Sequence, residues 1–217
     1  MDFFIRISYY LHIAAGVLSL LAGPMALIAK KGGRLHVISG RIFFYSMTII
    51  FLSATLNGLY KGMTFLTFVG VFSYYNVISG IRALQLRKLN GPAPVDYFIH
   101  GIALLSMLGF VAFGLSAWEV NKVFAGLAIG FGLAGVLNVK TYSGMVRHQF
   151  ATLPKVAFIK WHIGGLIGGF IASVTAFSVQ TMHFLPDLWQ WLWPTAVFVP
   201  VIAYWQRRYP VQQKATA

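Results

Sequence analysis

The sequence predicts an all-α membrane protein with seven membrane-spanning helices, and two observations support this fold class. Of its 217 residues, 58% are hydrophobic, only 10% are charged, and the mean hydropathy is +0.73. A soluble domain has about 25% charged and about 45–50% apolar residues, and a soluble core of this size could not bury so many apolar side chains. The composition therefore excludes a soluble globular enzyme, a disordered chain and an ordinary nucleic-acid-binding domain.

The second observation is the length of the apolar stretches. A helix needs about 20 mostly apolar residues to cross a bilayer, and seven stretches meet this requirement. Strands of a transmembrane barrel would alternate polar and apolar residues over about ten positions, and the sequence has no such alternation. The predicted helices, which form one domain over residues 1–217, are 7–29, 38–60, 63–84, 96–118, 122–140, 159–183 and 188–206.

The first predicted helix has one feature of a secretory signal, since Arg6 precedes an apolar run. That run continues to Lys30, which makes it longer than the core of about 7–15 residues found in signal peptides. In addition, Pro24 would directly follow a cleavage after Gly23. We therefore expect the first helix to remain in the protein.

The basic residues predict the orientation of the helices. Fourteen of the 17 Lys and Arg residues lie at alternate connections or after the last predicted helix, and the other three are Arg6, Lys61 and Lys122. Short cytoplasmic loops are rich in Lys and Arg, so we expect the N-terminus outside and the C-terminus in the cytoplasm of a bacterial inner membrane. Charges placed in this way meet anionic lipid head groups, so the net charge of +13 does not indicate nucleic acid.

Small residues predict where the helices pack. Gly165 and Gly169 lie on one face of the sixth helix, and Gly126 and Gly130 have the same spacing in the fifth. Such pairs let helix backbones approach closely in lipid. We expect both pairs to pack within the bundle and the sixth helix to be central, with a homo-oligomer interface or a cofactor surface as the alternative. In the seventh helix, three Trp residues mark the predicted outer interface.

Histidine is the one chemically versatile residue type that occurs several times in or near the predicted helices. In the predicted topology, His36, His100 and His162 lie near the cytoplasmic face on three different helices, and His12 and His183 lie near the outer face. Ionisable residues at such depths usually face the protein interior. The inner three predict a ligand site, and the alternative is that each imidazole bonds a backbone carbonyl or a lipid phosphate.

Haem and zinc are the two cofactors that such a cluster could hold. Two neutral imidazoles from facing helices can ligate the iron of a b-type haem, with nearby Arg or Lys for the propionates. Three histidines and a water molecule can instead bind zinc, as in membrane hydrolases. Such a hydrolase also needs a proton acceptor, and Asp96, one turn before His100, has the right depth. For Asp96 we expect a helix-capping role, with a general base as the alternative.

Transport is the third use of such a cluster. Pumps and coupled transporters rely on buried carboxylates or charged pairs, and the predicted helix interiors contain none. Charge-coupled transport is therefore disfavoured, whereas a route for a small solute stays open. Asn76, in the middle of the third helix, is expected to form a hydrogen bond between helices.

Six short motifs cover most of the chain: Tyr10-Leu11-His12, His36-x-x-x-Gly40-Arg41, Ser73-Tyr74-Tyr75, Ser79-Gly80-x-Arg82, Trp161-His162-Ile163 and Thr175-Ala176-Phe177. Together they resemble a family of predicted bacterial multi-pass membrane proteins whose domain is of unknown function. The family often carries Arg directly after the second histidine, where this chain has Val37. The resemblance implies a multi-helix membrane fold and supplies no reaction, so it identifies no catalytic residue.

The sequence thus predicts an integral membrane protein that binds haem b or a divalent metal such as zinc through His36, His100 and His162. The alternative, of a different class, is a membrane scaffold, an accessory subunit of a partner membrane protein or a small-solute carrier with interfacial histidines. No pattern identifies a reaction, so enzymatic activity stays open. Secondary candidates for the site are His12, His183 and Asp96.

Overall fold

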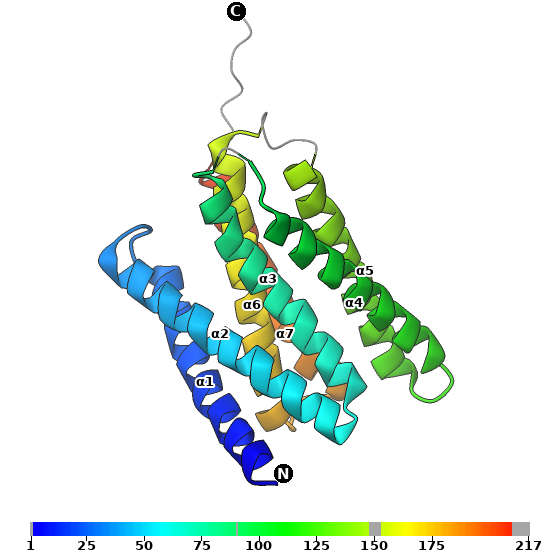
Figure 1. Ribbon diagram of the computed structural model, residues 1–217. Helices are drawn as coiled ribbons and strands as arrows, with labels where there is room; N and C mark the ends of the chain where they lie inside the picture. Colours follow the sequence, from blue (N-terminus) through cyan, green and yellow to red (C-terminus); the bar gives the residue numbers. More distant parts are fainter. Residues whose placement is uncertain (1, 90, 148–152, 210–217) are drawn as a thin grey trace, which may run out of the picture.

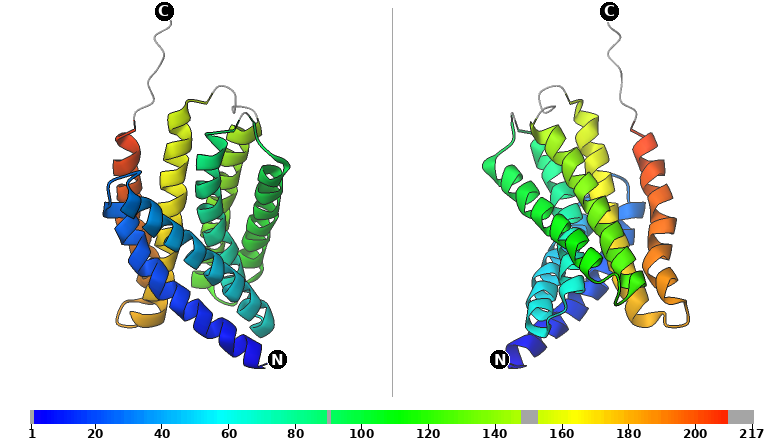
Figure 2. Two further views of the ribbon diagram at one scale, coloured as in Figure 1. Left: turned by 60° about the vertical axis from the view of Figure 1, so that its left-hand side comes forward. Right: turned by 90° about the vertical axis from the view of Figure 1, so that its right-hand side faces the viewer.

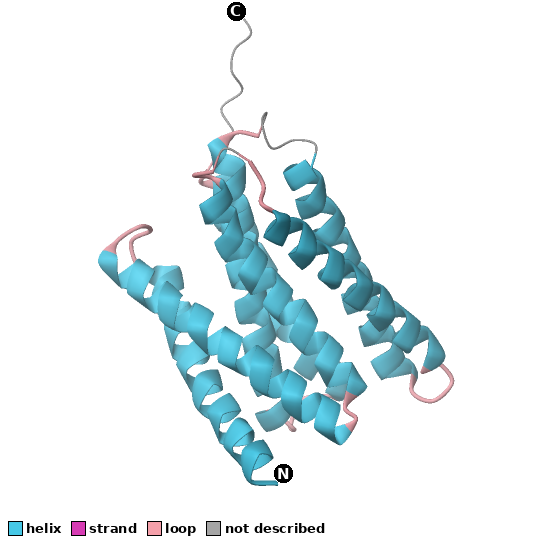
Figure 3. Cartoon of the chain, in the orientation of Figure 1, coloured by secondary structure: helices cyan, strands magenta, loops and turns pink. Residues whose placement is uncertain are grey.

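The computed structural model describes residues 2–89, 91–147 and 153–209, and within these ranges the chain forms helices joined by turns and loops, with no strand (Figure 3). The all-α prediction is confirmed, and each predicted stretch corresponds to one helix. Most helices extend beyond the apolar stretch that predicted them, because their polar ends continue the helix. They are α1 (Asp2–Ile28), α2 (Arg34–Lys61), α3 (Thr64–Leu86), α4 (Pro94–Ser116), α5 (Lys122–Arg147), α6 (Lys155–Thr181) and α7 (Asp187–Arg207).

Six of these helices, α1 to α6, are long and apolar enough to cross a membrane. Helix α7 contains Gln190, Pro194 and Pro200, which lower its hydropathy, so the seventh span stays a prediction. Large apolar side chains cover the outside of the bundle; Ile28 and Leu105, for example, are 81% and 73% exposed. A surface of this kind is unfavourable in water and suits contact with lipid, which indicates a membrane protein.

Successive helices run in opposite directions, so α1 begins and α7 finishes at opposite ends of the bundle (Figures 1 and 2). Helices α1, α3 and α5 finish, and α2, α4 and α6 begin, toward the end at which α7 finishes. Most of the Lys and Arg residues of the sequence lie at or near these helix ends, and we call this the basic end. That the basic end faces the cytoplasm stays a prediction from the charge bias.

Helices α3 and α6 form the centre of the bundle because glycines let their backbones meet. A Cβ atom added to Gly165 would lie 2.5 Å from the carbonyl oxygen of Asn76 and 2.8 Å from Cα of Gly80. A Cβ atom on Gly169 would clash with the side chain of Val77. Helix α3 also contacts α2, α4 and α5, and α6 also contacts α1 and α7. The expected packing of the sixth helix is confirmed, and α3 shares its central place.

The glycines that pack α5 are not the predicted pair. Gly132 and Gly135 face α4, and a Cβ atom on Gly132 would lie 3.0 Å from the backbone nitrogen of Val111. A Cβ atom on Gly126 or Gly130 would have no neighbour within 4 Å, and both residues are exposed. The prediction that this pair packs within the bundle is wrong, because a four-residue spacing identifies a face of the helix without identifying the neighbour it meets.

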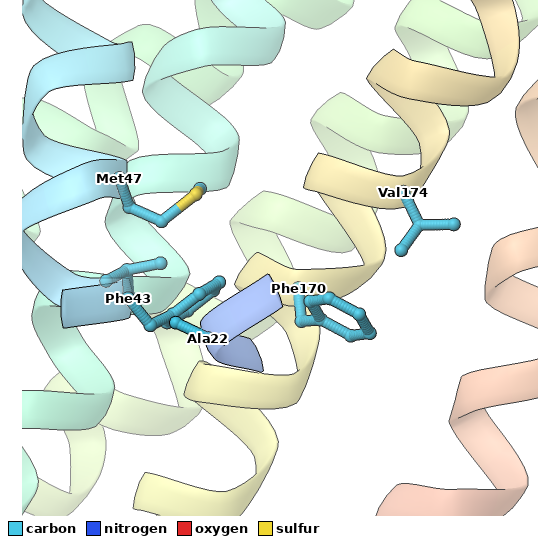
Figure 4. Packing of buried hydrophobic residues seen from close by; sticks show 6 residues of the cluster. Ala22, Phe43, Met47, Phe170 and Val174 are labelled. Atoms are coloured by element: carbon cyan, nitrogen blue, oxygen red, sulfur yellow. The ribbon is translucent and has the colours of Figure 1, made fainter. Parts of the chain in front are cut away.

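One apolar cluster joins the α1–α2 hairpin to the central helices (Figure 4). Phe43 of α2 and Phe170 of α6 meet edge to face with ring centroids 6.2 Å apart. One turn further along both helices, the hydroxyl group of Ser173 donates to the sulfur of Met47 over 3.0 Å. These contacts advance along both helices together, so α2 and α6 meet in a parallel register. The buried members of the cluster are Ala22, Phe43, Met47, Val77, Phe170 and Val174.

Candidate functional site

Two of the three inner histidines meet between α2 and α6. The ring centroids of His36 and His162 are 6.5 Å apart, and the rings are edge to face with an interplanar angle of 79°. Both side chains are half-buried. The pair lies about two helical turns before Phe43 and Phe170 on the same two helices, so the parallel register of α2 and α6 brings the histidines together.

Each imidazole of the pair is oriented by a backbone carbonyl. Nδ1 of His36 lies 2.9 Å from the carbonyl oxygen of Ala26, and Nδ1 of His162 lies 3.0 Å from that of Gly80. A carbonyl oxygen can only accept, so in the neutral rings Nδ1 carries the proton and Nε2 keeps its lone pair. Histidines that ligate metals are commonly held in this way, with the second ring nitrogen donating to a carbonyl or carboxylate.

The two carbonyl oxygens are accessible for local reasons. Ala26 lies in the last turn of α1, where carbonyl groups lack partners within the helix. Gly80 has no side chain, and α6 approaches it closely at Gly165, three residues after His162. The same glycine contact that packs α3 against α6 therefore also exposes the carbonyl that orients His162.

Lys31 completes the polar surroundings at the end of α1. Its ammonium group donates to the carbonyl oxygen of Ala26 over 3.0 Å and to that of Leu27, and lies 4.2 Å from the ring centroid of Trp205. A cation is favourable at a helix C-terminus, where the dipole is negative. Burial lowers the pKa of Lys31 from its ordinary value. Ala26 thus accepts from both Lys31 and His36, which fixes the α1–α2 connection.

His100 lies in a separate aromatic cluster. Its Nδ1 lies 3.0 Å from the hydroxyl oxygen of Tyr75, and its ring stacks on Trp161 with centroids 6.1 Å apart. Trp161 in turn stacks on Tyr142 at 4.2 Å. Trp161 and His162 are adjacent on α6, and neighbouring helical residues point in different directions, so each meets its own histidine.

The three inner histidines therefore do not form the single group that the sequence predicts. Among residues 2–89, 91–147 and 153–209, no three His, Asp, Glu or Cys side chains are placed to hold one metal ion. The structure brings His36 to His162 and leaves His100 with Tyr75 and Trp161. A two-histidine site is what this arrangement offers.

Both carboxylate oxygens of Asp96 accept hydrogen bonds. One oxygen accepts from Nε of Arg82 over 2.6 Å, and the other accepts from Nη2 of Arg82 over 3.1 Å and from the backbone N–H of Ala93 over 2.7 Å. The bond to Ala93 closes the first turn of α4, so the expected capping role is confirmed. With its oxygens occupied and only 1% of the residue exposed, Asp96 is poorly placed to act as a general base.

The pairing of Arg82 with Asp96 is a feature that the sequence analysis did not anticipate. It is the one ion pair among the described residues, and it ties α3 to α4. The sequence signal that could have suggested it is the presence of opposite charges at the same end of two consecutive helices.

The two outer histidines, His12 and His183, lie apart from the His36–His162 pair. Nδ1 of His12 lies 3.0 Å from the hydroxyl oxygen of Ser53, which itself donates to the carbonyl of Ile49 over 2.6 Å, so His12 is the donor. This contact joins α1 to α2. His183 is exposed in the turn between α6 and α7. Neither residue contributes to the His36–His162 pair.

Asn76 forms the interhelical bond expected of it. The side-chain amide of Asn138 on α5 donates to Oδ1 of Asn76 over 3.3 Å, and the amide of Asn76 donates to the carbonyl of Phe72 over 2.8 Å. Asn76 therefore joins α3 to α5, and these contacts account for it without a transport role.

Comparison with known proteins gives no match to a protein family, to a curated protein or to a solved structure. The resemblance to predicted bacterial membrane proteins therefore stays a prediction. The fold defines a multi-helix protein suited to a membrane, and at its basic end two histidine rings are in contact.

Proposed function

We propose that the protein binds a metal centre, foremost the iron of a b-type haem, between α2 and α6. The observation that supports this proposal is the pair His36 and His162, whose rings are 6.5 Å apart and whose Nδ1 atoms are both held by carbonyl groups. The Nε2 atoms are left with their lone pairs for a metal. Both residues are half-buried, so neither is completely enclosed by the bundle.

The number of histidines favours haem iron over zinc. Two neutral imidazoles from facing helices would be enough to hold the iron of a b-type haem. Zinc sites in proteins use three or four protein ligands, and no group of three His, Cys, Asp or Glu side chains lies together among the described residues.

Basic residues near the pair suit the carboxylates of a haem. Arg34 and Arg41 are exposed on α2, and Lys160 lies two residues before His162 on α6. Their positions in the sequence, close to His36 and His162, suit the propionates of a haem. A bound haem supplies one-electron chemistry, and the histidines and cations of this chain hold and orient it.

The test is an absorption spectrum of the full chain in detergent, oxidised and dithionite-reduced, with metal analysis of the same sample. We expect a Soret band and sharp reduced bands with one haem per chain. His36→Ala and His162→Ala should each abolish the bands, while the control His12→Ala, also half-buried and hydrogen-bonded, should keep them. One equivalent of metal without haem would instead support a divalent ion. A colourless, metal-free, folded protein that takes up neither haem nor metal would contradict the proposal.

A structural role for the same pair is the second candidate. His36 bonds the end of α1 and His162 bonds α3, so both imidazoles also stabilise helix packing without any ligand. This function is that of a membrane scaffold or accessory subunit. A thermal melt separates the two candidates. The haem proposal predicts that added haem raises the melting temperature of the wild type and not that of His36→Ala, whereas a scaffold predicts that added haem changes neither.

A further inference from the structure

We propose that a cleft between the C-terminal end of α3 and the N-terminal end of α6 binds an anionic phospholipid, with its phosphate on Arg87, Lys88 and Lys155. The three cations line one cleft together with Ile81, Leu84 and Gln85. The ends of α3 and α6 lie side by side at the basic end (Figure 1). This inference does not depend on the proposed metal centre.

Among the described residues, no carboxylate forms an ion pair with the cations of this cleft. The one ion pair among the described residues joins Arg82 to Asp96, and Arg87, Lys88 and Lys155 are all exposed. The acidic residues Glu119 and Asp187 lie at the opposite end of the bundle, in the α4–α5 turn and at the start of α7. The cleft therefore carries three positive charges that an anionic ligand would neutralise.

The amide group of Gln85 and the start of α6 would add to the attraction for an anion. Oε1 of Gln85 accepts from Nη1 of Arg82 over 2.7 Å, which leaves the amide N–H groups of Gln85 available for hydrogen bonds. Lys155 is the first residue of α6, whose N-cap, Pro154, provides no side-chain hydrogen bond. The positive end of the α6 dipole adds to the charge of Lys155. All of these groups favour a phosphate over a neutral head group.

The remaining wall of the cleft favours a lipid over a free phosphate. Ile81 and Leu84 are half-buried residues of α3 that line the same cleft, and an acyl chain would cover their exposed apolar surface. Basic pockets between membrane helices commonly bind anionic lipid head groups on the cytoplasmic side. The basic end is the predicted cytoplasmic end of this protein.

The experiment is native mass spectrometry of the full chain in mild detergent, titrated with dioleoylphosphatidylglycerol or dioleoylphosphatidylcholine. We expect phosphatidylglycerol to bind at least about tenfold more tightly than phosphatidylcholine. The triple variant R87Q/K88Q/K155Q should weaken phosphatidylglycerol binding by about 10- to 100-fold, since each basic residue near a lipid surface contributes on the order of a fivefold change. Soluble glycerol phosphate at the same concentration should not displace the lipid.

The matched control is K30Q/K140Q/R207Q, which removes the same charge from exposed residues outside the cleft. We expect it to weaken binding by less than about threefold. Equal losses in both triple variants, equal binding of both lipids, or displacement by glycerol phosphate would each overturn the proposal. Circular dichroism checks folding. Should the triple variant not fold, K155Q alone decides, with a loss of about fivefold expected and no loss overturning the proposal.

Discussion

The ring centroids of His36 and His162 are 6.5 Å apart, and this contact joins α2 to α6. The contact of Phe43 with Phe170 joins the same two helices. The histidines come from positions 126 residues apart in the chain, and the contacts of Phe43 with Phe170 and of Met47 with Ser173 join the same two helices further along. We therefore expect the position of the two histidines to depend on apolar side chains that are not themselves part of the candidate site.

Phe43→Ala should weaken the candidate site although Phe43 is not one of its residues. Removing this buried ring lowers the free energy of unfolding by about 3–5 kcal/mol, and it frees α2 to shift against α6. We expect a lower melting temperature and weaker haem uptake in the same variant. The control Leu105→Ala removes an apolar side chain that is 73% exposed and should change neither. Normal haem uptake by a destabilised Phe43→Ala protein would show that the register does not control the site.

Gly165→Ala should separate the central helices. The new methyl group would lie 2.5 Å from the carbonyl oxygen of Asn76 and 2.8 Å from Cα of Gly80, and backbone atoms cannot yield without moving α3 from α6. Overpacking of this kind destabilises by about 1–3 kcal/mol or more. The control Gly130→Ala has open space around its Cβ and should melt at or slightly above the wild-type temperature. Equal melting temperatures of the two variants would contradict the close contact.

Asp96→Asn should be strongly destabilising because it leaves the Arg82 guanidinium group without its carboxylate. Breaking a buried ion pair on one side lowers the free energy of unfolding by about 3–5 kcal/mol. The double variant R82Q/D96N should lose less than the sum of the two single variants, because the second change removes the unpaired charge. Chemical denaturation of all four proteins measures this coupling. Strict additivity would mean that the pair contributes nothing as a pair.

Tyr75→Phe should affect the cluster around His100 and leave the His36–His162 pair unchanged. The change removes the hydroxyl group that lies 3.0 Å from Nδ1 of His100, and the loss of one such hydrogen bond weakens folding by about 1 kcal/mol. We expect the Soret band to survive unchanged, because His100 is not a ligand in the proposed two-histidine site. Loss of the band from a folded Tyr75→Phe protein would restore His100 as a ligand.

Much of the architecture can be predicted from this sequence. Length and hydropathy along the chain fix the all-α class and the approximate position of each helix, and the structure confirms both. The alternation of basic residues agrees with the alternating ends of the helices. The capping role of Asp96 follows from its place in the first turn of α4. All of these features depend on residues that are close together in the chain.

The pairing of residues on different helices was decided by the tertiary structure. The sequence could not show that Trp161 turns to His100 while His162 turns to His36, nor that Gly132 and not Gly130 faces a neighbouring helix. In a soluble protein, the apolar face of a helix identifies its buried side. Here lipid and protein interior are both apolar, so hydropathy does not distinguish the two sides, and the faces that meet are chosen by the fit of small and large side chains across the helices.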